Sequence, residues 1–388
     1  MAEDKILQLR DRIDRLDHQI VQLLTERAVS ADEIGRLKRS KGMPVYDAFR
    51  ERALMQALSA QNMGPLPDSA LRRIYIEIIS ACRALQGPTN VSFLGPEATF
   101  THQAGLEYFG GSCNFKPVDS IRDVFKTVEN GHADFGVVPV ENSTEGAVGL
   151  TLDQLAVSEL KICGEIFLRI SHSLMSCEQD LSGIRQVLSH PQALAQCGDW
   201  LSRKLPGTAL VQVSSTAAGA QAAAEKDGTA AIGSEMLAGL HGLNVLARDI
   251  QDLTVNLTRF VVVGRQEPPG TGRDKTSLLF AALHRPGALR MALTPFAEQG
   301  INISRIESRP SKETPWEYVF FLDLEGHPSD EHMRSALDQL KERVSRLKIL
   351  GSYPVGELVG KRSEPGEIHC SDPAATEPPD LSRARAGG

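Results

Sequence analysis

Gln251-Asp252-Leu253-Thr254-Val255-Asn256-Leu257-Thr258-Arg259-Phe260-Val261-Val262-Val263-Gly264 is the segment around which the rest of the chain is arranged. Its β-branched residues and its final apolar run predict a strand. Because side chains alternate along a strand, one face would carry the polar groups of Thr254, Asn256 and Thr258. The opposite face would place Arg259 among valines and leucines, where a buried guanidinium needs a carboxylate partner. An edge strand with a solvated face is the alternative interpretation.

Length, charge and cysteine usage narrow the class of protein. A chain of 388 residues exceeds one ordinary core, so about two to three domains are expected. The net charge of -7 gives no sign of a nucleic-acid surface, and no apolar run approaches the ~20 residues of a membrane span. The six cysteines have no metal-like spacing, and the N-terminus does not resemble a signal peptide. Together these two features predict a cytoplasmic protein. The absence of a Walker loop, a dinucleotide fingerprint and an HExxH motif predicts chemistry without a cofactor or a metal.

The first 40 residues are predicted to form a long helix with an apolar stripe. The stripe contains Ile6, Leu9, Ile13, Leu16, Ile20 and Leu23. Continuing the seven-residue spacing places Arg27 inside the stripe, and Arg10 and Lys38 lie on its flank. A single charge beside a stripe is ordinarily a snorkelling side chain. Three cations along one buried seam instead suggest a buried anionic ligand.

The spacing of these cations predicts a dimer. Arg10 and Arg27 are about 25 Å apart along a helix, which no metabolite-sized ligand spans. Arg27 and Lys38 are about 16 Å apart, so their long side chains can converge on one ligand. Arg10 must therefore act elsewhere or reach the site of a second, antiparallel subunit, and we expect an intertwined helical dimer.

This region resembles the all-helical chorismate mutase family. The resemblance rests on Leu9-Arg10, Ile13, Asp17, Glu26-Arg27, Gly35, Lys38, Asp47, Arg50-Glu51 and Gln86. It implies that Arg27 and Arg10 of the partner subunit hold the two carboxylates of the substrate. It further implies that Lys38 and Gln86 contact the breaking ether oxygen and that Glu51 orients a hydroxyl group.

Three further substrate contacts are implied by the same resemblance, at Asp47, Arg50 and Cys82. Serine is frequent at the position of Cys82, and a thiol is the weaker hydrogen-bonding partner. The implied chemistry suits these residue types, since a pericyclic rearrangement needs only a compact substrate conformer and cations near the developing negative oxygen.

The central region alternates short apolar strands with helical patterns, which is typical of an α/β domain. Five strands end in a small hydroxyl or amide residue that opens a helix; these strands lie at 91–94, 135–140, 187–188, 211–213 and 230–232. Each helix start alone is an ordinary N-cap, but five together would line a crevice suited to a small anion. Midway through this region the chain passes through the segment 164–170, and it returns at 247–263. Two such passages predict two lobes with a cleft between them.

This central region resembles prephenate dehydratase over its full length. The motifs are Gly95-Pro96-x-x-Thr99-Phe100, Val138-Pro139-Val140-Glu141-Asn142-Ser143, Ser189-His190-Pro191-Gln192-Ala193-x-x-Gln196-Cys197, Ser215-Thr216 and Thr258-Arg259-Phe260. The resemblance implies a fold like that of periplasmic binding proteins. It implies a reaction that expels a ring hydroxyl and carbon dioxide to form an aromatic ring.

The resemblance also implies the roles of individual residues. Thr258 would donate a hydrogen bond to the departing hydroxyl, because an unperturbed threonine is too weak an acid to protonate it. Asn142, Gln196 and Glu141 would assist. The implied substrate contacts are Thr99, Ser143, Ser189, Ser215, Thr216, Arg259 and Phe260, with the alternative that Arg259 organises its triplet without touching the substrate.

The C-terminal region has the strand and helix order of a ferredoxin-like sandwich. Strands are expected at 275–280, 301–306, 318–323 and 347–354, with helices from His284 to Gln299 and over 330–345. The region resembles the ACT regulatory domain of prephenate dehydratases. That resemblance implies phenylalanine binding by Gly287-Ala288-Leu289 and by Glu307-Ser308-Arg309-Pro310, the second of which is expected to turn away from its strand. The fold alone carries no function.

The predicted architecture is a multidomain chain with an all-α part, a two-lobed α/β part and a ferredoxin-like α+β part. The expected boundaries are 1–88 for the mutase helices, 89–267 for the dehydratase, 273–355 for the ACT domain and 361–388 for a disordered tail. The predicted function is conversion of chorismate to prephenate and of prephenate to phenylpyruvate, with phenylalanine as effector.

The expected assembly is a homodimer or a higher homo-oligomer, without nucleic-acid or membrane partners. Two alternatives remain. One is a dehydratase for prephenate or arogenate with non-catalytic dimerisation helices, against which Arg27 in the apolar stripe argues. The other is a non-catalytic small-anion sensor, against which the polar row ending at Thr258 argues.

Overall fold

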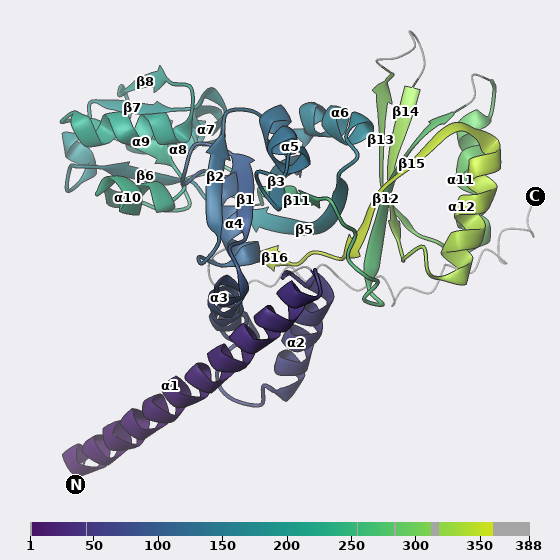
Figure 1. Ribbon diagram of the computed structural model, residues 1–388. Coiled ribbons are helices and arrows are strands. Elements are labelled where there is room, and N and C mark those ends of the chain that lie inside the picture. Colours follow the sequence, from purple (N-terminus) through teal and green to yellow (C-terminus); the bar gives the residue numbers. More distant parts are fainter. Residues whose placement is uncertain (1, 44, 254, 283–284, 312–317, 360–388) are drawn as a thin grey trace, which may run out of the picture.

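The structure is a computed structural model that describes residues 2–43, 45–253, 255–282, 285–311 and 318–359. Figure 1 shows three helices below a two-lobed α/β region, with a further sheet and its two helices beside the first lobe. Among the described helices, none combines the length and apolar content needed to cross a membrane. The predicted tail at 361–388 lies outside the described residues, as do Thr254 and His284.

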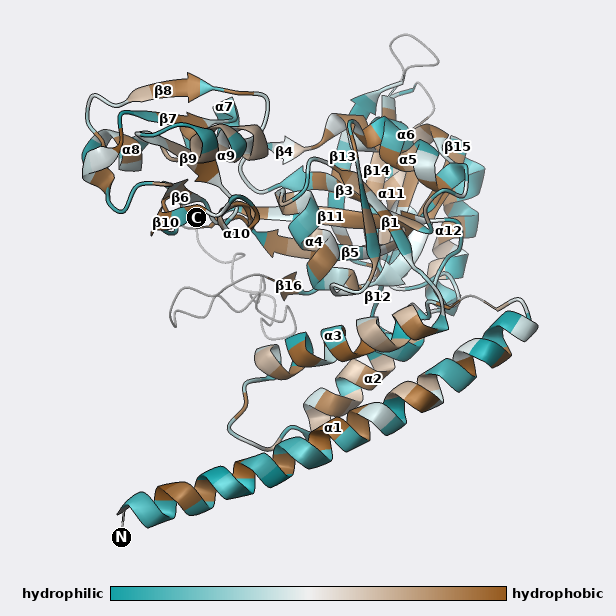
Figure 2. Cartoon of the chain, turned by 60° about the vertical axis from the view of Figure 1, so that its left-hand side comes forward, coloured by the Kyte–Doolittle hydropathy of each residue, from teal (hydrophilic) through white to brown (hydrophobic). Residues whose placement is uncertain are grey.

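The N-terminal part consists of α1 (Ala2–Ser40), α2 (Ala48–Gln61) and α3 (Asp68–Gln86). The α1 helix has 39 residues, so it is about 58 Å long. Its C-terminal part packs on α3, and its N-terminal half projects away from the rest of the chain (Figure 1). Figure 2 shows apolar bands along this projecting half, and Ile13, Ile20 and Leu23 are more than half exposed. An apolar stripe exposed over this length is typical of an interaction surface.

The first lobe is built on a mixed sheet with the strand order β16-β5-β11-β3-β1-β2, and a short β4 pairs with β3. The strands are β1 (Asn90–Leu94), β2 (Asn114–Val118), β3 (Phe135–Asn142), β4 (Gly146–Ala147), β5 (Lys161–Arg169), β11 (Leu257–Gly264) and β16 (Leu358–Val359). Its helices are α4 (Phe100–Phe109), α5 (Ile121–Glu129) and α6 (Gly149–Val157). The central strands β11 and β3 run antiparallel, with Thr258 opposite Asn142.

The second lobe is a five-stranded sheet in the order β10-β6-β9-β7-β8. Its strands are β6 (Ser173–Ser176), β7 (Gln186–Ser189), β8 (Ala209–Gln212), β9 (Thr229–Gly233) and β10 (Asn244–Ala247). The helices are α7 (Pro191–Gln196), α8 (Gly198–Lys204), α9 (Thr216–Glu225) and α10 (Met236–His241), with a 3-10 turn at Leu181–Gly183. The chain crosses between the lobes after β5 and again before β11, so the two-lobed prediction is confirmed.

The opening segment forms a shorter strand than the sequence predicts, since β11 begins only at Leu257. The reason lies in the preceding residues, which are held by the second lobe. The Asp252 carboxylate accepts hydrogen bonds from the backbone N–H groups of Asp199 and Trp200 at the start of α8. A segment fixed to one lobe by its side chain cannot also extend the sheet of the other lobe.

The C-terminal sheet has the order β13-β14-β12-β15 and confirms the ferredoxin-like prediction. Its elements are β12 (Asp274–Ala282), α11 (Ala288–Glu298), β13 (Ile303–Pro310), β14 (Tyr318–Glu325), α12 (Glu331–Arg343) and β15 (Val344–Pro354). The expected turn at Glu307 is wrong, because β13 continues through Pro310 and pairs with β14 as far as Tyr318.

One face of this C-terminal sheet shares a core with the first lobe. Leu279, Phe321, Leu350 and Tyr353 are buried in the same cluster as apolar residues of α5, α6 and β11. The other face is covered by α11 and α12. The sheet is therefore sandwiched between its own helices and the dehydratase lobe.

Candidate active sites

Two neighbouring strands bring Asn142 and Thr258 together at the centre of the first lobe. The Asn142 Nδ2 donates to Thr258 Oγ1 over 2.7 Å. The orientation of this amide is fixed, because Asn142 Oδ1 accepts the backbone N–H of Thr144 over 2.9 Å. Thr258 thus receives a hydrogen bond, which leaves its own hydroxyl proton available for another acceptor.

The hydrogen-bond chain continues from the first lobe to the second. Asn142 Nδ2 also donates to Asn256 Oδ1 over 2.9 Å, and Asn256 Nδ2 donates to Gln196 Oε1 over 3.2 Å. Gln196 ends α7 in the second lobe, whereas Asn142 ends β3 in the first. Asn256 and Thr258 are only 2% and 7% exposed. The structure therefore brings three of the four predicted dehydratase catalytic residues into one buried polar cluster.

His172 joins this cluster and was not predicted as a site residue. Its Nε2 lies 3.0 Å from Gln196 Oε1, which is an acceptor, so Nε2 carries the proton. The Nδ1 is then a buried acceptor without a hydrogen-bond partner among the described residues. Burial lowers the pKa of His172, although the hydrogen bond to Gln196 opposes this effect. A single histidine between two strands belongs to no motif, and only the crossing of the lobes reveals its position.

Glu145 and Gln192 form a second contact between the lobes that the sequence did not single out. Gln192 Nε2 donates to Glu145 Oε1 over 2.5 Å, and Gln196 Nε2 lies 3.4 Å from the same oxygen. Glu145 lies in the loop after β3 in the first lobe, whereas both glutamines belong to α7. The loop after Asn142 is thereby tied to the helix that carries Gln196.

Glu141, predicted as a catalytic residue, lies on the other face of the sheet. Consecutive strand residues point to opposite faces, so Glu141 faces away from Asn142. Its carboxylate lies 3.1 Å from Arg305 Nε of the C-terminal sheet and 3.9 Å from Arg259. The position of Glu141 therefore contradicts direct contact with the Thr258 cluster.

Arg259 has the carboxylate partner that the sequence analysis requires, and two carboxylates accept hydrogen bonds from it. Its Nε donates to Glu165 over 2.8 Å, and its Nη1 donates to Asp323. The Nη2 donates to the Tyr353 hydroxyl over 2.9 Å. All three nitrogens have protein partners, which corrects the expectation of a substrate contact and supports the alternative that Arg259 organises its triplet.

Several predicted substrate contacts of the dehydratase have structural partners in the described fold. Ser189 is fully buried and donates to the Ile232 carbonyl over 2.7 Å, and Phe260 is packed in an apolar core. These two side chains leave no surface for a ligand. Thr99 and Ser215 cap α4 and α9 as the sequence predicts, with Thr216 following the second cap. Ser143 Oγ accepts the backbone N–H of Leu257 and so fixes the start of β11.

Apart from Arg10 and Arg27, the predicted mutase residues lie around the junction of α1, α2 and α3. Lys38 Nζ donates to the Val45 carbonyl over 2.9 Å, and Asp47 caps α2 by accepting the Arg50 N–H. Lys38 and Asp47 also line a cavity of about 420 Å³. Within the described ranges, the buried Gln86 Oε1 has no hydrogen-bond partner. A buried orphan acceptor of this kind calls for a ligand or a further protein group.

Arg10, Arg27 and Gly35 lie on α1, and Cys82 is buried on α3. A Cβ at Gly35 would lie 2.8 Å from Gln86 atoms, so this glycine allows α1 to approach α3 beside the orphan amide. Arg10 is exposed on the projecting half of the helix. Arg27 is only partly exposed and stands between this half and the packed junction.

Glu51 forms an ion pair with Arg83, a residue that the sequence analysis missed. The Glu51 Oε1 lies 2.7 Å from Arg83 Nη1. Arg83 is buried, with its guanidinium 5.2 Å from the Tyr46 ring and 5.8 Å from the Phe109 ring. Burial raises the pKa of Glu51, while Arg83 opposes this shift. Because Phe109 belongs to α4, this ion pair also joins the helices to the dehydratase lobe.

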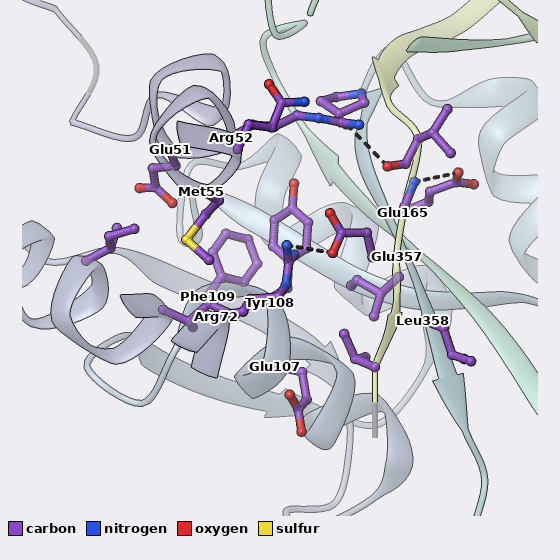
Figure 3. Close-up of a pocket in the computed structure, with 18 of the residues that line it drawn as sticks. Glu51, Arg52, Met55, Arg72, Glu107, Tyr108, Phe109, Glu165, Glu357 and Leu358 are labelled. Atoms are coloured by element: carbon purple, nitrogen blue, oxygen red, sulfur yellow. Dashed lines mark hydrogen bonds and ion pairs between the residues drawn. The ribbon is translucent and has the colours of Figure 1, made fainter. Parts of the chain in front are cut away.

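A cavity of about 570 Å³ lies where the helices, the first lobe and the C-terminal strands meet (Figure 3). Arg52 Nη1 donates to the Val355 carbonyl over 3.2 Å, and Arg72 pairs with Glu357 over 2.6 Å. Of the predicted site residues, only Glu51 lines it. The cavity is therefore a domain junction, and its charged groups serve to hold the chain segment that leads into β16.

The two predicted effector motifs lie at the same end of the C-terminal sheet, because Ala281, near the end of β12, and Arg309, near the end of β13, both pair with Val319 of β14. Gly287 caps α11 in the left-handed conformation at φ 77, which favours glycine. Ala288 and Leu289 then open the helix. On β13, Arg309 lies 3.5 Å from Asp153 of α6, so the segment containing Glu307, Ser308 and Pro310 abuts the dehydratase lobe.

Three family models match consecutive parts of the chain. Chorismate mutase type II matches residues 9–87, Prephenate dehydratase matches 91–268 and ACT domain matches 276–342. The fold and these matches define a chorismate mutase fused to a prephenate dehydratase and an ACT domain.

Curated relatives share this arrangement. A "Bifunctional chorismate mutase/prephenate dehydratase" from Aquifex aeolicus is 46% identical over 90% of this chain and 98% of its own. One of the same name from Neisseria gonorrhoeae is 45% identical over 92% and 99%. The chain belongs to the bifunctional chorismate mutase/prephenate dehydratase family.

A solved structure agrees with the dehydratase and ACT parts. The prephenate dehydratase from Arthrobacter aurescens, determined in complex with L-Phe, is 38% identical. It superimposes with a TM-score of 0.64 over 69% of this chain and 90% of its own.

Proposed function

We propose that the two activities of the family occur at two separate clusters of this chain. Chorismate is rearranged to prephenate at the helical junction around Arg27, Lys38 and Gln86. Prephenate is dehydrated and decarboxylated to phenylpyruvate beside Asn142 and Thr258. The observation that carries the second assignment is the 2.7 Å hydrogen bond from Asn142 to Thr258, within a buried polar chain that joins both lobes.

The dehydratase cluster suits a reaction whose driving force is aromatisation. The protein needs only to stabilise the charge on the departing hydroxyl while the carboxylate leaves as carbon dioxide. Asn142 donates to Thr258 Oγ1, so the Thr258 proton is directed away from Asn142 and toward the substrate. A hydrogen-bond donor aimed at a developing charge in a buried site acts without prior reorganisation. Gln196 reaches the same cluster from the second lobe, which excludes water when substrate lies between the lobes.

The mutase cluster is complete only in a dimer. Lys38 and Gln86 are on α1 and α3 of one chain, whereas the projecting half of α1 carries Arg10 away from them. The exposed apolar stripe on this half supports an antiparallel partner helix. In that assembly Arg10 of the partner subunit and Arg27 hold the carboxylates of chorismate. The orphan Gln86 amide and Lys38 then face the ether oxygen, where negative charge develops.

Phenylalanine is the proposed effector of the C-terminal domain. The Arthrobacter aurescens relative was determined with L-Phe, and this chain carries the same type of domain. Gly287 opens α11 in a conformation that exposes backbone N–H groups, which suits an amino-acid carboxylate. The motif Glu307–Pro310 lies on β13, which contacts the dehydratase lobe through Arg309.

The test supplies chorismate and follows its loss and the appearance of phenylpyruvate separately. The unmodified protein is expected to show both signals. Arg27→Ala should lose chorismate consumption yet still dehydrate supplied prephenate, and Thr258→Val should accumulate prephenate. Supplying arogenate in parallel determines substrate preference. Parallel loss of both activities in either folded variant would contradict two separate sites.

A further inference from the structure

Behind the Thr258–Asn142 pair, on the opposite face of the same two strands, lies a second pair. Arg259 is directly opposite Glu141 across the β11–β3 ladder, as Thr258 is opposite Asn142. Neighbouring strand residues share one stiff backbone, so displacement of Arg259 also displaces Thr258. The same coupling connects Glu141 to Asn142.

The Arg259 guanidinium is almost entirely enclosed, and two of its three partners belong to the C-terminal domain. It is 6% exposed. Glu165 comes from β5 of the dehydratase lobe, whereas Asp323 and Tyr353 come from β14 and β15. A buried charge requires all of its partners, because each lost partner leaves an uncompensated group. The strand that carries Thr258 is thus incomplete without the ACT sheet.

A network of polar groups fixes these partners in turn. Ser277 donates to Asp323, so its oxygen is free to accept from the Tyr353 hydroxyl 2.6 Å away. Lys275 Nζ binds Glu165 over 2.8 Å. Both Ser277 and Lys275 lie on β12, one of the two inner strands of the ACT sheet.

The carboxylate and hydroxyl in this network keep defined protonation states. Burial alone would raise the pKa of the Asp323 carboxyl, but Arg259 and the Ser277 hydroxyl together hold it below its usual value. Burial and the nearby Asp323 carboxylate raise the pKa of Tyr353 well above its usual value. Asp323 is therefore ionised and Tyr353 is neutral at physiological pH.

A second contact holds Glu141. Its carboxylate lies 3.1 Å from Arg305 Nε on β13. The same strand carries Glu307 to Pro310, and its Arg309 reaches Asp153 of α6. All four strands of the ACT sheet thus provide a polar group that reaches the dehydratase lobe or the Arg259 network.

We propose that Arg259 and Glu141 are positioning residues through which the ACT sheet sets the geometry of the Thr258–Asn142 pair. This proposal rests on the dehydratase function assigned above and specifies how that site is regulated. A shift of β14 or β15 on effector binding moves Asp323 or Tyr353, and Arg259 transmits the movement along β11 to the Thr258 hydroxyl. The substrate is never in contact with this network.

Tyr353→Phe is the sharpest test, because it removes one hydroxyl and keeps the ring in the shared core. The dehydratase kcat should fall about tenfold, less than the ~10²-fold that a displacement of ~1 Å costs, while KM changes little. Half-maximal inhibition should also shift to a different phenylalanine concentration. Mutase activity of the same chain serves as an internal control and should stay unchanged. Tyr318→Phe, at a tyrosine that is 51% exposed on the same sheet, is the matched control and should leave all three readouts unchanged.

Arg259→Lys provides a second, independent measurement. Lysine keeps the charge but cannot bind three partners from a planar fork, so dehydratase kcat should fall by more than in Tyr353→Phe. The proposal is overturned if both variants keep the parental kcat and phenylalanine response. It is also overturned if both activities fall together with the melting temperature, since this would indicate a purely structural role. Absence of prephenate turnover by the unmodified protein would instead overturn the assigned function.

Discussion

At the scale of single residues, the proposed dehydratase site depends on which atom donates each hydrogen bond. Asn142 is oriented by the Thr144 N–H and donates to Thr258, so the threonine proton stays available for another acceptor, which we propose to be the substrate. The sequence identified Thr258, Asn142 and Gln196 through motifs. It missed His172, because a lone histidine has no spacing signal. The family resemblance also implied a catalytic role for Glu141, whereas the alternation of β3 directs this side chain to the face opposite Asn142.

Thr258 offers the most direct test of this arrangement. Thr258→Val keeps the shape but removes the donor, and loss of one donor to a developing charge costs roughly 10²–10³ in kcat. Thr258→Ser keeps the hydroxyl but frees its rotamer, so it should retain partial activity. Steady-state kinetics with prephenate measure both, and mutase activity is the control. A stable Thr258→Val protein with near-normal kcat would move the catalytic assignment to Asn142 and Gln196.

His172 predicts a dependence of stability on pH. Burial lowers its pKa in the folded protein, while the unfolded chain keeps the ordinary value near ~6.5. Below that value the unfolded chain binds a proton that the folded chain does not, so stability falls as the pH decreases. The melting temperature should therefore drop between about pH 7.5 and about pH 5.5, and drop less in His172→Gln. An equal drop in both proteins would assign the effect to other groups.

At the scale of elements, one strand and one helix organise the two activities. The β11 strand presents Thr258 to the site and Arg259 to the ACT sheet, which the alternation of a strand makes unavoidable. The α1 helix packs on α3 with one part and leaves the apolar stripe of the other part exposed (Figure 2). The periodicity of the sequence predicted both elements, but only the strand pairing identified the partners of Arg259.

Subunit mixing tests the dimeric mutase site. Arg10→Ala and Arg27→Ala proteins should each be inactive as mutases. If Arg10 acts in the partner's site, a mixed dimer holds one intact site, so mixing should restore up to about a quarter of the parental rate. Size-exclusion chromatography with differently tagged chains checks the exchange. No recovery after confirmed exchange would show that Arg10 does not complete the site of a partner.

At the scale of the whole molecule, the dehydratase and ACT parts share one hydrophobic core. The boundary expected from the sequence, between residues 267 and 273, suggests an independent regulatory domain. The structure instead places Leu279, Phe321 and Tyr353 in the core of the dehydratase lobe. It also continues the chain beyond β15 into β16, which pairs with β5. We therefore expect regulation by this domain to act through the shared core and the shared ion network.

Deletion of residues 272–388 tests this view. Each buried apolar side chain contributes about 1.5–3 kcal/mol, and breaking a buried ion pair costs about 3–5 kcal/mol. Together these losses reach the total stability of a typical domain, about 5–15 kcal/mol. The truncated protein should lose dehydratase activity and cooperative unfolding, as measured by turnover of prephenate and circular dichroism. A truncated dehydratase that is active and insensitive to phenylalanine would show that the two parts fold independently.

The sequence by itself determined most of the elements, the fold classes and three residues of the proposed dehydratase cluster, namely Thr258, Asn142 and Gln196. These properties follow from local periodicity, capping and motif identity, which are carried by neighbouring residues. Only the tertiary structure decided which side chains meet, because Asn142 and Thr258 are 116 positions apart and their contact depends on strand register. The same register turns Glu141 and Arg259 toward the ACT sheet. Their partners Asp323 and Tyr353 come from strands far along the chain, and only the packing of two sheets brings them together.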